Sequence, residues 1–182
     1  EIEKIEQIRK NFSQETQKLS PDILKKELER FVIELSWKSS KIEGNTYTLL
    51  ETEELLKKNK QASGRSQEEA GMIINHKKAF ETILENRQDF KKLTLAKVNQ
   101  LHNILVKDLN ISTGLRKQAV GITGTVYKPL DNEFQIREAL TKLCELVNKN
   151  DSPFEKALII KAMIPYLQPY TDGNKRTGRM LA

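Results

Sequence analysis

The segment Gln168–Arg179, with the sequence QPYTDGNKRTGR, holds the residues best suited to chemistry. Gly173 lies between two short polar residues, and a glycine there permits a tight turn with positive φ. Such a turn directs successive backbone N–H groups toward one point, and the free N–H groups of a following helix point the same way. We therefore expect this loop to bind an anion, with a final helix that begins at Lys175.

The charged side chains beside the turn favour a polyphosphate as the anion. Arg176 and Arg179 are three residues apart, so they share one face of the expected helix. Cations in a first helical turn oppose the helix dipole by roughly 0.3–1 kcal/mol each, and a bound polyphosphate would reverse that sign. Asp172 adds a carboxylate, which suits Mg²⁺ held jointly with phosphate oxygens. By spacing alone, an ordinary Asp-Gly turn with surface arginines fits equally well.

A second segment, residues 39–45, carries an acidic side chain at the end of a helix where it is electrostatically unfavourable. Ser39 and Glu43 are four residues apart and lie on one face of an expected helix. Glu43 falls in the last turn, just before Gly44-Asn45, where an anion opposes the helix dipole. An acid at the unfavourable end of one helix is a natural partner for arginines at the unfavourable end of another. An unpaired surface glutamate is the alternative interpretation.

These segments resemble the Fic family. The family signature reads His-x-Phe-x-Asp/Glu-Gly-Asn-Gly/Lys-Arg-x-x-Arg, and it is matched here at Asp172, Gly173, Asn174, Lys175, Arg176 and Arg179. Tyr170 replaces the phenylalanine. Residues 39–45, SSKIEGN, are similar to the inhibitory motif Ser/Thr-x-x-x-Glu-Gly/Asn. Residues 114–129 are similar to the flap hairpin of the family, which here includes Val120, Ile122, Gly124 and Tyr127.

The resemblance implies a protein that transfers AMP from ATP to a hydroxyl group of a target protein. It implies that Asp172 holds Mg²⁺ and that the next residues line an anion hole and contact the phosphates: Gly173, Asn174, Lys175, Arg176 and Arg179. It also implies that the flap aligns the target segment through strand-like pairing. The inhibitory motif, which comprises Ser39, Glu43 and Gly44, would act by pairing Glu43 with Arg179, and this pairing displaces the γ-phosphate.

Gln168 stands where the family has its catalytic histidine. An amide does not accept a proton near neutral pH, and the loss of a general base typically slows a reaction by about 10²–10⁴-fold. Phosphate binding does not depend on that residue, so we expect binding to outlast catalysis. The open interpretations are a nucleotide-binding pseudoenzyme, a slow or altered transferase, an engineered inactivation, and a non-catalytic module that acts through partner contacts. Pro165, one turn before the loop, is a second departure.

Helical patterns dominate the elements that must position these residues, so the expected fold is mainly α, a Fic-fold helical bundle with a small β-hairpin flap around Thr123-Gly124. We expect helices with an apolar stripe at Ile5, Ile8 and Phe12, from Ser20-Pro21 to Gly44, from about 94 to 107, and from about Glu133. Capping boxes at residues 48–51, 66–69 and 152–155 predict three more helix starts. The helix after residue 152 is nearly all apolar, which predicts deep burial, and Pro165 should kink or end it.

Composition restricts the remaining possibilities. The 182 residues carry a net charge of +6, with lysines and glutamates interleaved, so nucleic acid is an improbable partner. Cys144 is the single cysteine, which suits a reducing, cytoplasmic location, and no apolar run predicts a membrane span. His76 and His102 lie in separate helical patterns, which predicts structural or surface roles for both.

We expect residues 1–65 to form an N-terminal helical region that contains the inhibitory motif Ser39–Asn45. Residues 66–182 would form a Fic core that lacks its C-terminal part. The expected ligands are ATP and Mg²⁺, and the expected protein partner is an unidentified target or the protein itself, with a homo-oligomer as a further possibility.

Overall fold

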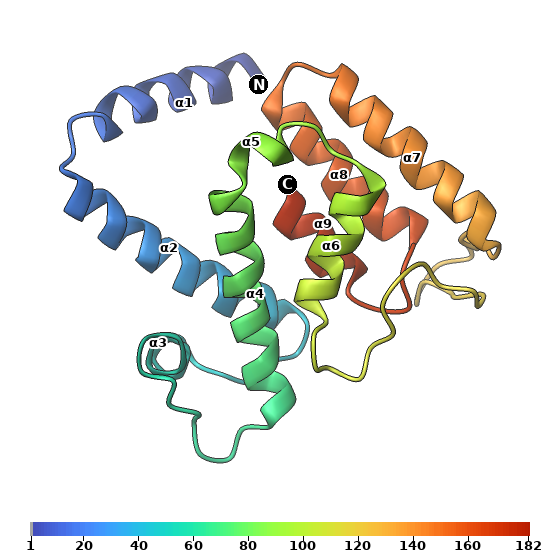
Figure 1. The fold of residues 1–182 in the computed structure, drawn as a ribbon, viewed down its shortest axis with the longest axis horizontal. Helices are drawn as coiled ribbons and strands as arrows, with labels where there is room; N and C mark the ends of the chain where they lie inside the picture. Colours follow the sequence, from blue (N-terminus) through green and yellow to red (C-terminus); the bar gives the residue numbers. More distant parts are fainter. Residues whose placement is uncertain (1) are drawn as a thin grey trace.

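The computed structural model describes residues 2–182, which fold into helices joined by loops (Figure 1). The helices are α1 (Ile2–Thr16), α2 (Pro21–Ile42), α3 (Leu49–Lys58), α4 (Gln67–Glu85), α5 (Arg87–Phe90), α6 (Leu95–Leu105), α7 (Glu133–Lys149), α8 (Pro153–Leu167) and α9 (Asn174–Leu181). The prediction of a mainly α fold is confirmed. The short α5, which follows directly after α4, was not expected from the sequence.

Polar caps fix where the helices begin. Thr48 and Ser66 each form a complete capping box, with Glu51 and Glu69 as the reciprocal partners, as the sequence predicts. At α8 the Ser152 hydroxyl accepts the backbone N–H of Glu155, while no return bond from the Glu155 side chain is recorded among the described residues. The third predicted capping box is therefore half formed.

Three apolar clusters join the helices, and two of them include residues of α9. The first joins α6, α7 and α8 around Leu140, Ile164 and Tyr170. The second joins Ile33 of α2 and Tyr47 to Ile73 of α4. The third packs Ala79, Leu101, Leu105 and Met180 of α4, α6 and α9. Residues on both sides of position 65 thus share a core, and α9 lies where α4, α6 and α8 meet (Figure 1).

Helix α8 departs from its predicted burial. Ile160, Ile164 and Leu167 point inward, but Leu158 is 61% exposed and Tyr166 is 48% exposed. The expectation that this helix would be well buried was wrong, because α7 and α9 cover only part of its surface. Pro165 lies inside α8 and does not end it, since the helix continues to Leu167.

The predicted β-hairpin flap is not formed as paired strands within residues 2–182. The turn is present: the backbone N–H of Thr125 donates to the carbonyl of Ile122 at 3.1 Å, and Gly124 has a φ of 80°. An isolated two-stranded ribbon is marginally stable without a further strand or an apolar support, which explains the missing pairing. The Tyr127 ring stacks on Tyr166 of α8 at 4.2 Å between centroids, and this contact supports one side of the loop.

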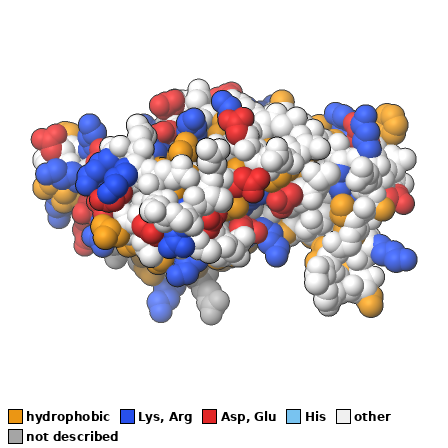
Figure 2. Space-filling view, turned by 90° about the horizontal axis from the view of Figure 1, so that it is seen from below, with side chains coloured by type: hydrophobic (Ala, Val, Ile, Leu, Met, Phe, Trp, Pro, Cys, Tyr) orange, Lys and Arg blue, Asp and Glu red, His pale blue; other side chains and the backbone are white. Residues whose placement is uncertain are grey.

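Helix α1 and the beginning of α2 lie at the edge of the molecule, whereas the end of α2 passes behind α4 (Figure 1). Helix α1 has no buried residue, although its apolar stripe predicted an amphipathic helix. On the face drawn in Figure 2, basic and acidic side chains are interspersed, as expected from their interleaving in the sequence. No helix within residues 2–182 has the length and apolar character needed to cross a bilayer.

Candidate functional site

The loop between α8 and α9 turns sharply at Gly173. This glycine has a φ of 79° and occupies the N-cap position of α9, where no side chain caps the helix. Its own N–H donates to Asp172 Oδ1 at 2.6 Å, and its carbonyl accepts the N–H of Thr177 at 2.8 Å. The first turn of α9 is therefore left without a side-chain acceptor, which is the arrangement that binds an anion.

Helix α6 supports the turn closely from one side. A Cβ at Gly173 would lie 2.9 Å from Val106 Cγ1 and 3.3 Å from His102 Nε2, so a side chain at this position would clash. His102 Nε2 donates to the carbonyl of Asp172 at 2.9 Å, and the His102 ring stacks on Tyr170 at 3.6 Å. The sequence placed His102 only in an amphipathic helix and gave no sign that it holds the turn.

Asn174 closes the loop from inside. Its buried side chain accepts the N–H of Tyr170 at 2.9 Å and donates to the carbonyl of Tyr170 at 2.9 Å. The same amide nitrogen lies 2.9 Å from Gln168 Oε1, which accepts a second hydrogen bond from it. Asn174 thus fixes the path of residues 168–174, so its side chain shapes the loop from within.

Gln168 caps the end of α8. It has a φ of 47°, in the left-handed region, and its Nε2 donates to the carbonyl of Pro165 at 2.7 Å. Pro169 has no N–H with which to donate to that carbonyl, so the glutamine amide takes over this function. The Gln168 side chain is therefore a structural part of the loop.

Arg116 links the base of the flap to the same loop. Its Nε donates to the carbonyl of Gln168 at 2.5 Å, and its backbone N–H donates to the carbonyl of Pro169 at 3.0 Å. The other guanidinium nitrogens donate to the carbonyls of Gln118 and Leu130. Burial lowers the pKa of Arg116. The sequence marked Arg116 as part of the flap motif but did not reveal that it positions the loop.

Arg176 lies buried behind the turn with one nitrogen unsatisfied. Its Nη2 contacts Asp172 Oδ2 at 3.1 Å, and 2% of the residue is exposed. Its Nη1 is buried and has no hydrogen-bond partner within residues 2–182. An unsatisfied buried donor costs about 1–3 kcal/mol, and more when it is charged. An anion at the turn would give this nitrogen an acceptor. Lys175 is exposed, next to Arg176 on the outer side of α9.

Arg179 reaches across to the end of α2. Its Nη2 lies 2.5 Å from Glu43 Oε1 and 3.2 Å from the carbonyl of Ser39. Its Nε donates to Ser39 Oγ at 3.0 Å. The expected pair of Glu43 with Arg179 is thus present, and it joins residues 136 positions apart. The expectation that Arg179 lies at the unfavourable end of its helix was wrong, because α9 ends at Leu181 and Arg179 falls in its last turn. Gly44, with a φ of 91°, follows and ends this contact segment.

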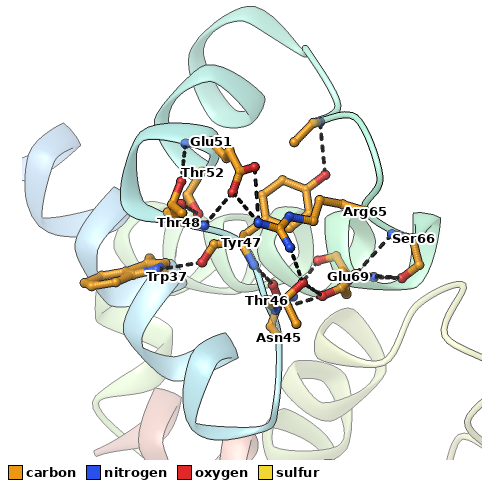
Figure 3. Close-up of polar contacts among 11 residues, drawn as sticks. Trp37, Asn45, Thr46, Tyr47, Thr48, Glu51, Thr52, Arg65, Ser66 and Glu69 are labelled. Atoms are coloured by element: carbon orange, nitrogen blue, oxygen red, sulfur yellow. Dashed lines mark hydrogen bonds and ion pairs between the residues drawn. The ribbon is translucent and has the colours of Figure 1, made fainter.

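A polar network fixes the segment that follows residues 39–45 (Figure 3). Glu69 Oε1 accepts the N–H of Thr46 at 2.7 Å and its hydroxyl at 2.6 Å. Arg65 donates to Thr46 Oγ1 at 2.8 Å and to Glu51 Oε2 at 3.1 Å. Hydrogen bonds from Thr46 and Ser66 lower the pKa of Glu69 to about 2. The C-terminal end of α2 is therefore fixed to the N-termini of α3 and α4.

The donor set at the turn suits a cation that arrives with phosphate. Asp172 has a side chain that is 64% exposed, so one carboxylate is accessible at the rim of the turn. No group of three or more His, Cys, Asp or Glu side chains within residues 2–182 could hold a metal by itself. Mg²⁺ usually takes one or two carboxylates together with phosphate oxygens and waters, and this pattern fits Asp172.

Two buried histidines should make stability depend on pH. Burial lowers the pKa of His76 to about 4 and also lowers that of His102, whereas an unfolded histidine titrates near 6.5. The unfolded chain therefore binds more protons below pH 6.5, so the stabilisation present above that pH should be lost as pH falls toward 4. We expect a loss of roughly 1–3 kcal/mol, which denaturant unfolding at pH 7 and pH 4.5 would measure.

His76→Gln is the control for that pH dependence, because it removes one of the two titrating groups. The difference in unfolding free energy between the two pH values should shrink in this variant. An unchanged difference would show that His76 does not titrate differently in the two states.

Comparison with known proteins places this geometry among related structures. Residues 92–182 match the Fic/DOC family. A Fic-domain-containing signaling protein from Bacteroides thetaiotaomicron is 26% identical with a TM-score of 0.81, covering 96% of this chain and 69% of that one. Fic-1 from C. elegans is 19% identical with a TM-score of 0.80, with coverages of 99% and 54%. A Fic family protein from Desulfovibrio desulfuricans is 22% identical with a TM-score of 0.72, with coverages of 91% and 49%.

The last two likenesses concern the fold alone. The chain spans about half the length of those two solved chains, so each of them includes parts that this chain does not match.

Proposed function

The chain belongs to the Fic/DOC family. We propose that it binds a nucleoside polyphosphate with Mg²⁺ at the turn formed by Asp172–Arg179. We further propose that Gln168 slows the transfer of a nucleotide group to an acceptor. Proteins of this family commonly transfer AMP to other proteins. ATP is accordingly the proposed ligand, and a protein hydroxyl, on a target or on the protein itself, is the proposed acceptor.

The observation that carries the proposal is the buried guanidinium of Arg176. It lies behind an uncapped helix N-terminus, and its Nη1 has no acceptor within residues 2–182. A phosphate oxygen would satisfy that nitrogen and would also meet the backbone N–H groups of α9. Lys175, which is exposed beside the turn, would add charge on the outer side.

Asp172 would change partners when the nucleotide binds. In the free protein its carboxylate contacts Arg176 at 3.1 Å. With nucleotide bound, the phosphates would take over Arg176 and the carboxylate would turn to Mg²⁺. The ion would supply neutralisation of phosphate charge when bound. The flap residues Val120, Ile122, Gly124 and Tyr127 would then align a target segment by backbone pairing, which would also complete the ribbon that is unpaired here.

Gln168 accounts for the proposed weakness of transfer. Its side chain is engaged by Pro165 and Asn174, and an amide does not take the proton of an attacking hydroxyl near neutral pH. Binding does not require that residue, so the protein would bind nucleotide well and transfer AMP slowly or not at all.

Glu43 would restrain nucleotide binding. Its contact with Arg179 occupies the guanidinium that the terminal phosphate would otherwise use. A nucleotide with a γ-phosphate must therefore break an ion pair, whereas AMP need not.

We expect titration calorimetry to detect MgATP binding to the intact protein. Asp172→Ala should weaken the dependence on Mg²⁺, and Glu43→Gly should tighten ATP binding by about tenfold, since a partly buried charged hydrogen bond is worth about 1.5 kcal/mol. Glu34→Gln is a matched control, because Glu34 forms its ion pairs on α2 itself, with Arg30 and Lys38, away from Arg179. An absence of heat with ATP, ADP and AMP would leave a partner-binding module without nucleotide as the function.

A further inference from the structure

The inhibitory contact is supported from behind by a buried histidine of α4. His76 is fully buried, and its Nε2 lies 2.8 Å from Ser39 Oγ, the hydroxyl that also receives Arg179 Nε at 3.0 Å. His76 Nδ1 lies 2.8 Å from the carbonyl of Met72. These contacts form a continuous chain from the backbone of α4, through α2, to α9.

The donors and acceptors in this chain have a single consistent assignment. The Met72 carbonyl can only accept, so Nδ1 must carry the proton of a neutral imidazole. Nε2 then bears the lone pair, and the Ser39 hydroxyl must donate to it. Because the Ser39 hydroxyl donates its hydrogen to His76, the lone pairs of the Ser39 oxygen face Arg179. Ser40 Oγ, 3.5 Å from Nδ1, packs against the same ring.

The charges around His76 favour that neutral form. Arg176 and Arg179 of α9 both face it and lower its pKa, in addition to the larger effect of burial. The side chains that α2 places against the ring, Ser39 and Ser40, are uncharged. A protonated ring would put a third cation beside two arginines and would turn Nε2 from an acceptor into a donor.

We propose that His76 is a positioning residue for autoinhibition. By accepting a hydrogen bond from the Ser39 hydroxyl, it turns the lone pairs of the Ser39 oxygen toward Arg179 and so strengthens the contact between α2 and that arginine. The inference rests on the proposed function and adds a residue that lies outside both the phosphate-binding signature and the inhibitory motif. Residues of three helices then act together, since α4 orients Ser39 of α2 and Ser39 holds Arg179 of α9.

The test compares MgATP affinity among single and double variants. His76→Leu should tighten ATP binding by roughly three- to tenfold, as expected for the loss of one hydrogen bond that supports the competing contact. Ser39→Ala should have a similar effect, and the double variant should bind no more tightly than either single one. His76→Gln, whose Oε1 can accept the Ser39 proton, should restore an affinity close to that of the intact protein.

Ser36→Ala is the matched control. Ser36 is 1% exposed on the same helix, but no hydrogen bond joins it to Arg179 within residues 2–182, so this change should leave ATP affinity unaltered. The role of His76 would be overturned if the effects of His76→Leu and Ser39→Ala on ATP affinity were fully additive. It would also be overturned if His76→Leu left ATP affinity unaltered while Glu43→Gly raised it. A Glu43→Gly variant with unchanged affinity would instead overturn the proposed inhibition by Glu43.

Nitrogen NMR of the imidazole separates these failures and does not require His76→Leu to fold. In the intact protein at pH 7, the His76 ring should carry its proton on Nδ1, and the Nε2 resonance should shift in Ser39→Ala as it loses its donor. A proton on Nε2, or a resonance that does not respond to Ser39→Ala, would overturn the proposal.

Discussion

Gln168→His combined with Glu43→Gly is expected to create or greatly raise self-AMPylation. A histidine Nδ1–H can donate to the Pro165 carbonyl as the glutamine amide does now at 2.7 Å, and this leaves Nε2 free to accept the proton of an attacking hydroxyl. Restoring a general base is worth about 10²–10⁴-fold in rate. Removing Glu43 frees Arg179 for the terminal phosphate. Incorporation of label from ATP labelled at the α-phosphate measures the gain.

The two single variants and one matched double variant separate the two contributions. In the double variant Gln168→Leu with Glu43→Gly, the leucine is similar in size to glutamine but cannot accept a proton, and it also loses the hydrogen bonds to Pro165 and Asn174. ATP binding is therefore measured together with labelling, and this variant should bind ATP and stay at background labelling. Equal labelling by the intact protein and the Gln168→His double variant would refute the view that Gln168 limits transfer. Binding without labelling in the histidine variant would shift the cause to Pro165 or to the unpaired flap.

Gly173→Ala should be the most damaging single substitution in the loop. The glycine has a φ of 79°, which costs an L-residue about 1–2 kcal/mol, and the added Cβ would lie 2.9 Å from Val106 Cγ1. Overpacking of this kind costs about 1–3 kcal/mol more. We expect a total loss of roughly 2–5 kcal/mol in unfolding free energy and at least tenfold weaker MgATP binding, because the turn must move away from α6.

Gly64→Ala isolates the cost of the backbone conformation in that experiment. Gly64 has a φ of 77°, close to that of Gly173, but an added Cβ there meets no atom within 4 Å. Its loss should therefore be limited to about 1–2 kcal/mol, with ATP binding unaffected. Denaturant unfolding of both variants measures the difference, and equal losses would show that the contact with Val106 is accommodated without cost.

Local patterns predicted the helices and the turn well, because they depend on neighbours in sequence. Thr48 and Ser66 cap helices as expected, and α9 begins at Asn174, one residue before the predicted start. The pairing of Glu43 with Arg179 was implied by the family resemblance and is present. The dipole argument holds for Glu43 at the C-terminal end of α2, but not for Arg179, which lies in the last turn of α9, where a cation is favourable. The functions assigned to Asp172, to the phosphate-binding residues 173–179, to the inhibitory motif and to the flap remain predictions.

The supports of the site could not be predicted in the same way. His102, Arg116 and His76 act through backbone carbonyls or hydroxyls far away in the sequence, and no local pattern marks such a contact. The burial of α8 was overestimated because an apolar composition records what a helix can bury and not which of its faces has a neighbour. The missing pairing of the flap has the same origin, because a strand needs a partner that the composition of the strand does not provide.

The contact between α2 and α9 joins two segments that are synthesised at different times. Ser39 and Glu43 precede Arg179 by 140 and 136 residues, so α2 leaves the ribosome first. At about 5–20 residues per second, the delay is roughly 7–27 s. Glu43 is therefore already synthesised when Arg179 first appears, so the two can pair as soon as α9 forms. Under the proposed function, a newly made molecule would begin with Arg179 held by Glu43, and its first nucleotide would have to displace that carboxylate.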